Sequence, residues 1–154
     1  MKDPDLPLDG SCRCGSVRFR VTAPPLATMA CHCTGCQKMS ASAFSASAAF
    51  PADGFELLAG DPVIGGLKGE TRHYFCQDCM TWLYTRPEGV DFMVNIRATM
   101  LDDTSWFAPF METYLSEKLD WAETGAPHGF EQFPTMDDIE RLTPAFNTAM
   151  GRSG

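Results

Sequence analysis

Seven cysteines lie in three tight groups along this chain of 154 residues. The groups are Cys12 with Cys14, Cys31 with Cys33 and Cys36, and Cys76 with Cys79. In a reducing compartment structural disulfides are rare, and C-x-C and C-x-x-C spacings are typical of metal ligands. Buried free thiols and a redox pair are the alternatives. The spacings therefore predict metal binding, and a fold that brings separate cysteine-bearing segments together.

The composition narrows the class of protein. The formal net charge is −8, from 12 Lys and Arg against 20 Asp and Glu. Such a balance argues against a nucleic-acid partner, whose phosphates are neutralised by cations, and gives no attraction to an anionic membrane. No run of 18 or more apolar residues exists, and the first residues lack the apolar segment of a signal peptide. We expect a cytoplasmic protein with one domain over residues 1–154.

The hydrophobic pattern is mostly of period two, which predicts short, half-buried strands. In "SVRFRV" Val17, Phe19 and Val21 share one face, opposite Arg18 and Arg20. Further strands are expected at 46–50, 55–59, 81–86, 91–96 and 111–115. The glycine-rich segment 60–70 lacks the spacing of a phosphate-binding loop, so it is expected to be a hairpin turn or a flap.

Helical signals are few. Residues 37–40 are compatible with one helical turn after the central cysteines. In "PTMDDIERL" Thr135 is a predicted N-cap, followed by Asp137 and Asp138 in the first turn, and Pro144 is expected to end or kink the helix. The fold prediction is a single, mainly β domain of antiparallel strands with metal-binding loops and a short helical tail at about 135–154.

Zinc geometry constrains the cysteine groups. Zinc holds thiolates at about 2.3 Å, whereas side chains at i and i+2 of a straight strand stand roughly 6–7 Å apart. Both C-x-C pairs must therefore lie on bent backbone, for which Gly15 and Gly35 can supply positive φ angles.

Of two partitions of the cysteines, the first is favoured because it uses every cysteine. In the first, four thiols form a closed structural site, and the other three form a site with one open position, as in catalytic zinc sites. The four are Cys12, Cys14, Cys76 and Cys79; the three are Cys31, Cys33 and Cys36. In the second, the central three recruit an outside ligand and leave the other thiols unused. His32 is disfavoured as that ligand because it should point to the opposite face, and His73 and His128 are expected to be surface or packing residues.

The cysteine groups, in the order "GSCRCGSVRF", "CHCTGCQK" and "YFCQDC", resemble those of the glutathione-dependent formaldehyde-activating enzyme family, of which centromere protein V is a distant relative. The later segment "SEKLDWAETGAPHGFEQFP" resembles the closing segment of that family. The resemblance extends over about residues 9–134. It implies a β-tent fold of coiled antiparallel sheets.

The resemblance also implies two zinc ions per chain. Cys12, Cys14, Cys76 and Cys79 match the structural ligands, and Cys31, Cys33 and Cys36 match the ligands of the catalytic zinc. The family usually has glycine after the late C-x-x-C, where this chain has Met80.

The function expected from these observations is that of a zinc-dependent carbon–sulfur lyase acting on a small thiol adduct, such as S-hydroxymethylglutathione formed from glutathione and formaldehyde. Glutathione is anionic, and Lys38, Arg13, Arg72 and Arg97 are candidate cations for it, although surface positions are the default expectation for each. A non-enzymatic, zinc-stapled interaction module is the main alternative, and a metal-free redox switch is a third.

Overall fold

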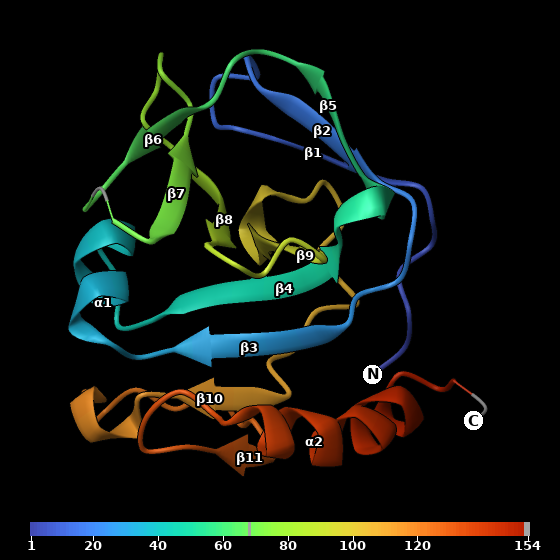
Figure 1. Cartoon of the computed structure of the whole chain (residues 1–154), viewed down its shortest axis with the longest axis vertical. Coiled ribbons are helices and arrows are strands. Elements are labelled where there is room, and N and C mark those ends of the chain that lie inside the picture. The colour runs from blue at the N-terminus through green and yellow to red at the C-terminus, as the bar shows by residue number, and fades with distance from the viewer. Residues whose placement is uncertain (68, 153–154) are drawn as a thin grey trace.

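The computed structural model describes residues 1–67 and 69–152. Within them the chain folds into a three-stranded sheet, in the order β1-β2-β5, and an eight-stranded sheet, in the order β11-β10-β3-β4-β9-β8-β7-β6 (Figure 1). The strands are β1 (Leu8–Ser11), β2 (Arg18–Val21), β3 (Ala27–Cys31), β4 (Ser45–Pro51), β5 (Phe55–Ala59), β6 (Val63–Gly65), β7 (Thr71–Phe75), β8 (Trp82–Pro87), β9 (Met93–Arg97), β10 (Met111–Thr113) and β11 (His128–Gly129). The helices are α1 (Thr34–Ser40) and α2 (Met136–Ala149), with 3-10 turns at Ala52–Gly54, Ala98–Met100 and Leu115–Glu117. The mainly β fold with a short C-terminal helix is confirmed.

The strand β2 shows why the period-two pattern is informative. Val17, Phe19 and Val21 are almost completely buried, whereas Arg18 is exposed and Arg20 half-buried. Arg20 Nε lies 2.6 Å from the carboxylate of Asp9 on the neighbouring β1. The strand therefore turns its apolar face to the core, and an ion pair joins it to β1 on the other side.

The eight-stranded sheet is built around β4, which pairs antiparallel with β3 and β9. The exception to antiparallel pairing is β10, which runs parallel to both β3 and β11. Parallel neighbours require a long crossover between them, and the chain leaves β3 at Cys31 and returns only at Met111. This arrangement places the end of β3, with its cysteine, beside β4 and β10.

The segment expected to be a hairpin turn or flap is partly a strand, because β6 pairs antiparallel with β7. Lys68, in the middle of the segment, lies outside the described residues. Of the two expectations for this segment, the antiparallel pairing of β6 with β7 supports the hairpin.

Helix α2 begins as the sequence predicts. The hydroxyl of Thr135 accepts a hydrogen bond from the backbone N–H of Asp138, and the Asp138 carboxylate accepts one from the Thr135 N–H, which forms a capping box. Pro144 does not end the helix, which continues to Ala149. Leu142 and Phe146 are buried in the core on either side of the proline, so tertiary packing outweighs the hydrogen bond that proline removes.

Figure 1 shows α2 beside β11 at the bottom of the molecule, on the opposite side from the three-stranded sheet. Residues 153–154 of the predicted tail lie outside the described residues. Across the described ranges, no helix has both the length and the apolar character needed to cross a membrane.

We propose that the helical tail and the sheets unfold together as one domain. The centroid of the Phe146 ring lies 5.3 Å from the centroid of the Phe110 ring. Phe146→Ala should therefore lower the free energy of unfolding by about 3–5 kcal/mol, which is the usual cost of truncating a buried phenylalanine. Denaturant unfolding followed by tryptophan fluorescence and by circular dichroism measures it. Phe133→Ala, at a residue that is 54% exposed, is the control and should change stability by less than about 0.5 kcal/mol. Two separate transitions would contradict the single domain.

Candidate metal centres

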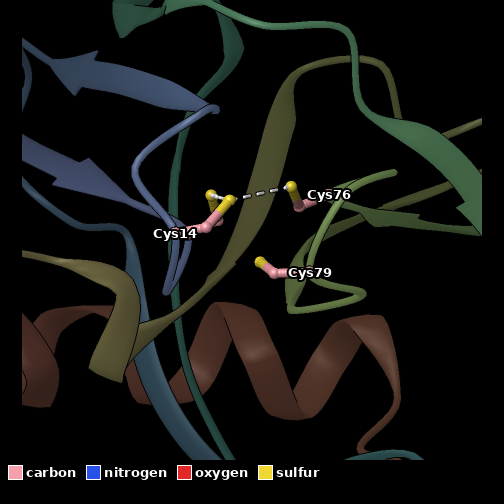
Figure 2. A group of neighbouring side chains, drawn as sticks. Cys14, Cys76 and Cys79 are labelled. Atoms are coloured by element: carbon pink, nitrogen blue, oxygen red, sulfur yellow. Dashed lines mark hydrogen bonds between the residues drawn. The ribbon is translucent and has the colours of Figure 1, made fainter.

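Four thiols meet between two hairpins. Cys12 and Cys14 lie in the turn between β1 and β2, and Cys76 and Cys79 lie in the turn between β7 and β8. Figure 2 shows Cys14 facing Cys76 and Cys79 across the gap between the two turns. The four sulfur atoms all lie within 4.8 Å of one another. The hairpins come from different sheets, so this cluster joins the three-stranded sheet to the eight-stranded sheet.

The sulfur spacing fits a tetrahedral metal. Cys12 Sγ is 3.5 Å from Cys14 Sγ, which is 3.8 Å from Cys76 Sγ. Tetrahedral zinc with bonds of 2.3 Å would place its sulfurs about 3.8 Å apart. The cluster can therefore hold a metal ion, and its four soft donors are those that zinc prefers.

Backbone geometry holds the first turn. Gly15 has a φ of +81°, as the sequence predicts for this bend, and its N–H donates to the Cys12 carbonyl. The N–H of Val17 donates to Cys12 Sγ at 3.3 Å. The turn thus brings both sulfurs of the C-x-C pair to one side and directs a backbone donor at one of them.

The second turn is closed by hydrogen bonds from the N–H of Met80 to the Cys76 carbonyl and from the N–H of Cys76 to the Thr81 carbonyl. A hydrogen bond with the Thr81 hydroxyl, 3.1 Å from Cys79 Sγ, lowers the pKa of the Cys79 thiol to about 5. This polar contact favours the thiolate, which is the form that binds metal.

Met80 occupies a left-handed backbone conformation, with a φ of +56°. Residues other than glycine adopt this region at a cost. The turn itself requires the positive φ, which the glycine expected here from the family resemblance would adopt without this cost. The methionine keeps the turn intact, and its side chain is mostly exposed.

The second cluster consists of Cys31, Cys33 and Cys36, whose sulfurs also lie within 4.8 Å of one another. Cys31 ends β3, Cys33 is the N-cap of α1, and Cys36 lies in the first turn of α1. The Cys33 sulfur accepts a hydrogen bond from the backbone N–H of Cys36 at 3.3 Å. All three are half-buried.

The turn in this cluster differs from the one expected. The sequence predicts a positive φ at Gly35, and that prediction is wrong. Gly35 lies within α1, and its φ angle is not positive. Helix α1 starts directly after Cys33, so its first turn brings Cys36 back towards Cys33. The helix is also longer than the single turn expected at 37–40.

The thiols of this cluster lie close enough to shift one another's pKa. A hydrogen bond with Cys36 lowers the pKa of the Cys31 thiol to about 5, against the effect of burial, and the Thr113 hydroxyl lowers it further. The same bond and burial raise the pKa of Cys36. One thiolate is thus stabilised by its neighbours before any metal binds.

His32 is turned away from the three thiols. Its side chain is fully buried, with Nε2 3.0 Å from the Glu112 carboxylate and the ring packed against Phe44. It lies outside the group of residues able to share a metal. His73 donates to or accepts from Thr85 and packs on Trp82, and His128 packs on Phe110, so both are packing histidines as expected.

Arg97 is the candidate cation for which the expected surface position is wrong. It ends β9 with only 7% of its surface exposed. Its guanidinium lies 4.0 Å above the Trp82 ring. Burial lowers the pKa of Arg97 to about 10, and the charges of the three nearby thiols oppose that shift. Lys38, Arg13 and Arg72 are exposed, as expected.

Sequence comparison identifies the family. The profile described as glutathione-dependent formaldehyde-activating enzyme matches residues 7–117. A protein of Halomonas elongata, described as a candidate glutathione-dependent formaldehyde-activating enzyme, is 28% identical over 125 residues, which cover 75% of this chain and 80% of that protein. The chain therefore belongs to the glutathione-dependent formaldehyde-activating enzyme family.

A structural likeness agrees at the level of fold. The crystal structure of a Rhodobacter sphaeroides protein superposes on this chain with a TM-score of 0.51 and 17% sequence identity. The superposed part covers 61% of this chain and 87% of the Rhodobacter sphaeroides chain. At this identity the likeness supports the fold alone.

The left-handed conformation of Met80 yields a stability prediction. Met80→Gly should raise the free energy of unfolding by about 1 kcal/mol, because glycine adopts positive φ without the penalty that other residues incur. Urea unfolding of the metal-loaded protein measures it. Met80→Ala retains the strain and should change stability by less than about 0.5 kcal/mol. A larger gain from alanine than from glycine would show that the side chain, not the backbone, is the source of the cost.

Proposed function

We propose that this protein is a zinc-dependent carbon–sulfur lyase acting on the adduct of a small thiol and an aldehyde, with glutathione and formaldehyde as the expected pair. The observation that carries the proposal is the contrast between the two clusters. In the described part of the chain, one cluster has four candidate ligands and the other has three. A three-ligand site with a free position is the pattern of a catalytic zinc, and a four-ligand site that of a structural one.

In this proposal Cys12, Cys14, Cys76 and Cys79 hold a structural zinc, and Cys31, Cys33 and Cys36 hold a catalytic one. A zinc ion at the three-thiol cluster would supply Lewis acidity and favour the deprotonated form of a substrate thiol. The chain's own contribution is to present three thiolates on one side. The backbone N–H of Cys36 stabilises one of those thiolates by donating a hydrogen bond to the Cys33 sulfur.

The reaction forms one bond between the substrate sulfur and the carbonyl carbon of the aldehyde. The thiol proton is transferred to the carbonyl oxygen, which becomes the hydroxyl of the hydroxymethyl thioether. The reverse direction breaks the carbon–sulfur bond and returns the proton to sulfur. No electrons are gained or lost, so no redox cofactor is needed.

A surface hollow next to α1 can accommodate the rest of a thiol such as glutathione. Its volume is about 570 Å³, and its lining includes Gln37, Lys38 and Trp121. Gln37 and Lys38 directly follow Cys36 in α1. An exposed lysine in this hollow suits a substrate with free carboxylates, in a chain that is otherwise acidic.

The metal content tests the assignment of the two sites. We expect two zinc ions per chain by native mass spectrometry. Cys36→Ser should lose one ion and leave the fold largely intact, whereas Cys79→Ser should lower stability by several kcal/mol, because a structural zinc contributes folding energy directly. Thermal melts compare the two variants. If Cys36→Ser were the more destabilising change, the structural and catalytic roles would be reversed.

The activity is tested with ¹³C-formaldehyde and glutathione at equilibrium, where exchange spectroscopy reports the rate at which the adduct forms and breaks. Wild-type protein should accelerate the exchange, and Cys36→Ser should return it to the uncatalysed rate. Met80→Ala, at a distance in the other turn, is the matched control and should retain the acceleration. If fully zinc-loaded wild-type protein left the exchange at its uncatalysed rate, both with glutathione and with other small thiols, the result would favour the non-enzymatic interaction module.

A further inference from the structure

The buried Arg97 has no carboxylate partner in the part of the chain that the structure describes. The ion pairs found there all involve other residues. The Arg97 guanidinium instead contacts neutral groups: the hydroxyls of Ser45 and Thr85, each at 3.4 Å, and the carbonyl of Asn95 at 3.2 Å. Its Nε is buried without a partner. Burying a cation is costly unless an opposite charge lies nearby, so the position of Arg97 calls for an anion.

The three-thiol cluster is the anion that the sheet places next to it. In the register of the eight-stranded sheet, Cys31 of β3 is opposite Ser45 of β4, and Ser47 of β4 is opposite Arg97 of β9. The guanidinium is therefore one strand away from β3 and close to the start of β4. Ser45, which is opposite Cys31, is also within hydrogen-bond distance of the guanidinium.

Ser45 links the cation to the cluster. Its side chain is buried, and its hydroxyl oxygen accepts a hydrogen bond from Arg97 Nη1 at 3.4 Å. Its backbone is paired with that of Cys31 on the neighbouring strand. Ser45 thus lies between the guanidinium and the strand that carries Cys31.

We propose that Arg97 is the counter-ion of the metal centre held by Cys31, Cys33 and Cys36, and that Ser45 positions it. The inference rests on the assignment of a metal to these thiols in the proposed function. Three thiolates around a divalent ion leave one negative charge, and a thiolate in the fourth position leaves two. A fixed cation in a buried environment offsets this charge more effectively than a solvated one.

The structure also accounts for how the guanidinium is held in place. The face of Trp82 lies against it at 4.0 Å, and Trp82 in turn packs edge-on against His73. Stacking of a guanidinium on an indole face is favourable and restricts the rotation of the planar group. Arg97 is therefore a positioning residue: it acts on the bound thiolate through the charge of the centre and does not itself contact the substrate.

The test uses cobalt, which reports both metal binding and thiolate binding through charge-transfer absorption. Cobalt affinity is measured on the full chain by competition with a chromophoric chelator, and glutathione is then titrated into the loaded protein. In Arg97→Gln we expect affinity at the three-thiol site to fall about tenfold or more, and affinity for glutathione to fall by a similar factor, because one nearby charge has been removed. The four-thiol site should be unchanged and is the internal reference. Arg97→Lys should recover most of both losses.

Arg18→Gln is the matched control, because it removes one positive charge from an exposed residue of β2; both affinities should stay at the wild-type values. Wild-type affinities in a folded Arg97→Gln protein would overturn the inference. If that variant does not fold, Ser45→Ala carries the test: we expect about threefold weaker metal binding at the three-thiol site, from loss of one charge-assisted hydrogen bond, and unchanged binding would overturn the inference. A wild-type protein that binds no second metal would instead overturn the metal assignment itself.

Discussion

The convergence of four thiols between two hairpins is the contact on which the rest of the structure depends. Cys14 and Cys76 are 62 residues apart in sequence, yet their sulfurs lie 3.8 Å apart. One hairpin belongs to the three-stranded sheet and the other to the eight-stranded sheet. Aromatic packing between Phe55 of β5 and Tyr84 of β8, with rings 5.1 Å apart, joins the same two sheets through the core. A metal at the thiols would fix the relative position of the two sheets at a second place, away from this aromatic contact.

The three-thiol cluster is built from similar spacings but has a different environment. Its ligand candidates come from a single segment, from the end of β3 into α1, so a metal there would close a local loop and would not join distant parts of the chain. A buried arginine lies nearby, whereas the four-thiol cluster has backbone and hydroxyl donors around it. We propose that stability and reactivity are separated between two clusters of the same ligand type. The proposed division between a structural and a catalytic zinc follows from this difference.

Much of the fold could be predicted from the sequence, for identifiable reasons. Strands with one face exposed, such as β2, keep the alternation that reveals them. The strand β3 was not predicted, because its central residues are buried on both faces and show no alternation. The continuation of α2 past Pro144 depends on core contacts of Leu142 and Phe146, and local propensity does not report such contacts.

The cysteine groups gathered by the fold are the two that counting favoured. Close spacing in a turn already implies close sulfurs within each pair, whereas the meeting of the first and last pairs, 62 residues apart, was favoured only because it completes a set of four ligands. The environment of the second cluster could not be predicted in the same way. Arg97 sits at the end of an alternating strand, and its burial arises only from the pairing of β9 with β4 and from the Trp82 ring. The positive φ of Met80 was likewise hidden, since methionine carries no signal for a left-handed turn.

The most direct test of the account is anomalous diffraction at the zinc edge from crystals of the whole chain grown with and without glutathione. The account predicts two anomalous peaks per chain, one bonded to Cys12, Cys14, Cys76 and Cys79 and the other to Cys31, Cys33 and Cys36. With glutathione, the second zinc should gain the glutathione sulfur as its fourth ligand. A single peak at full zinc loading, or a second zinc whose fourth ligand is a side chain of the protein in both crystals, would contradict it.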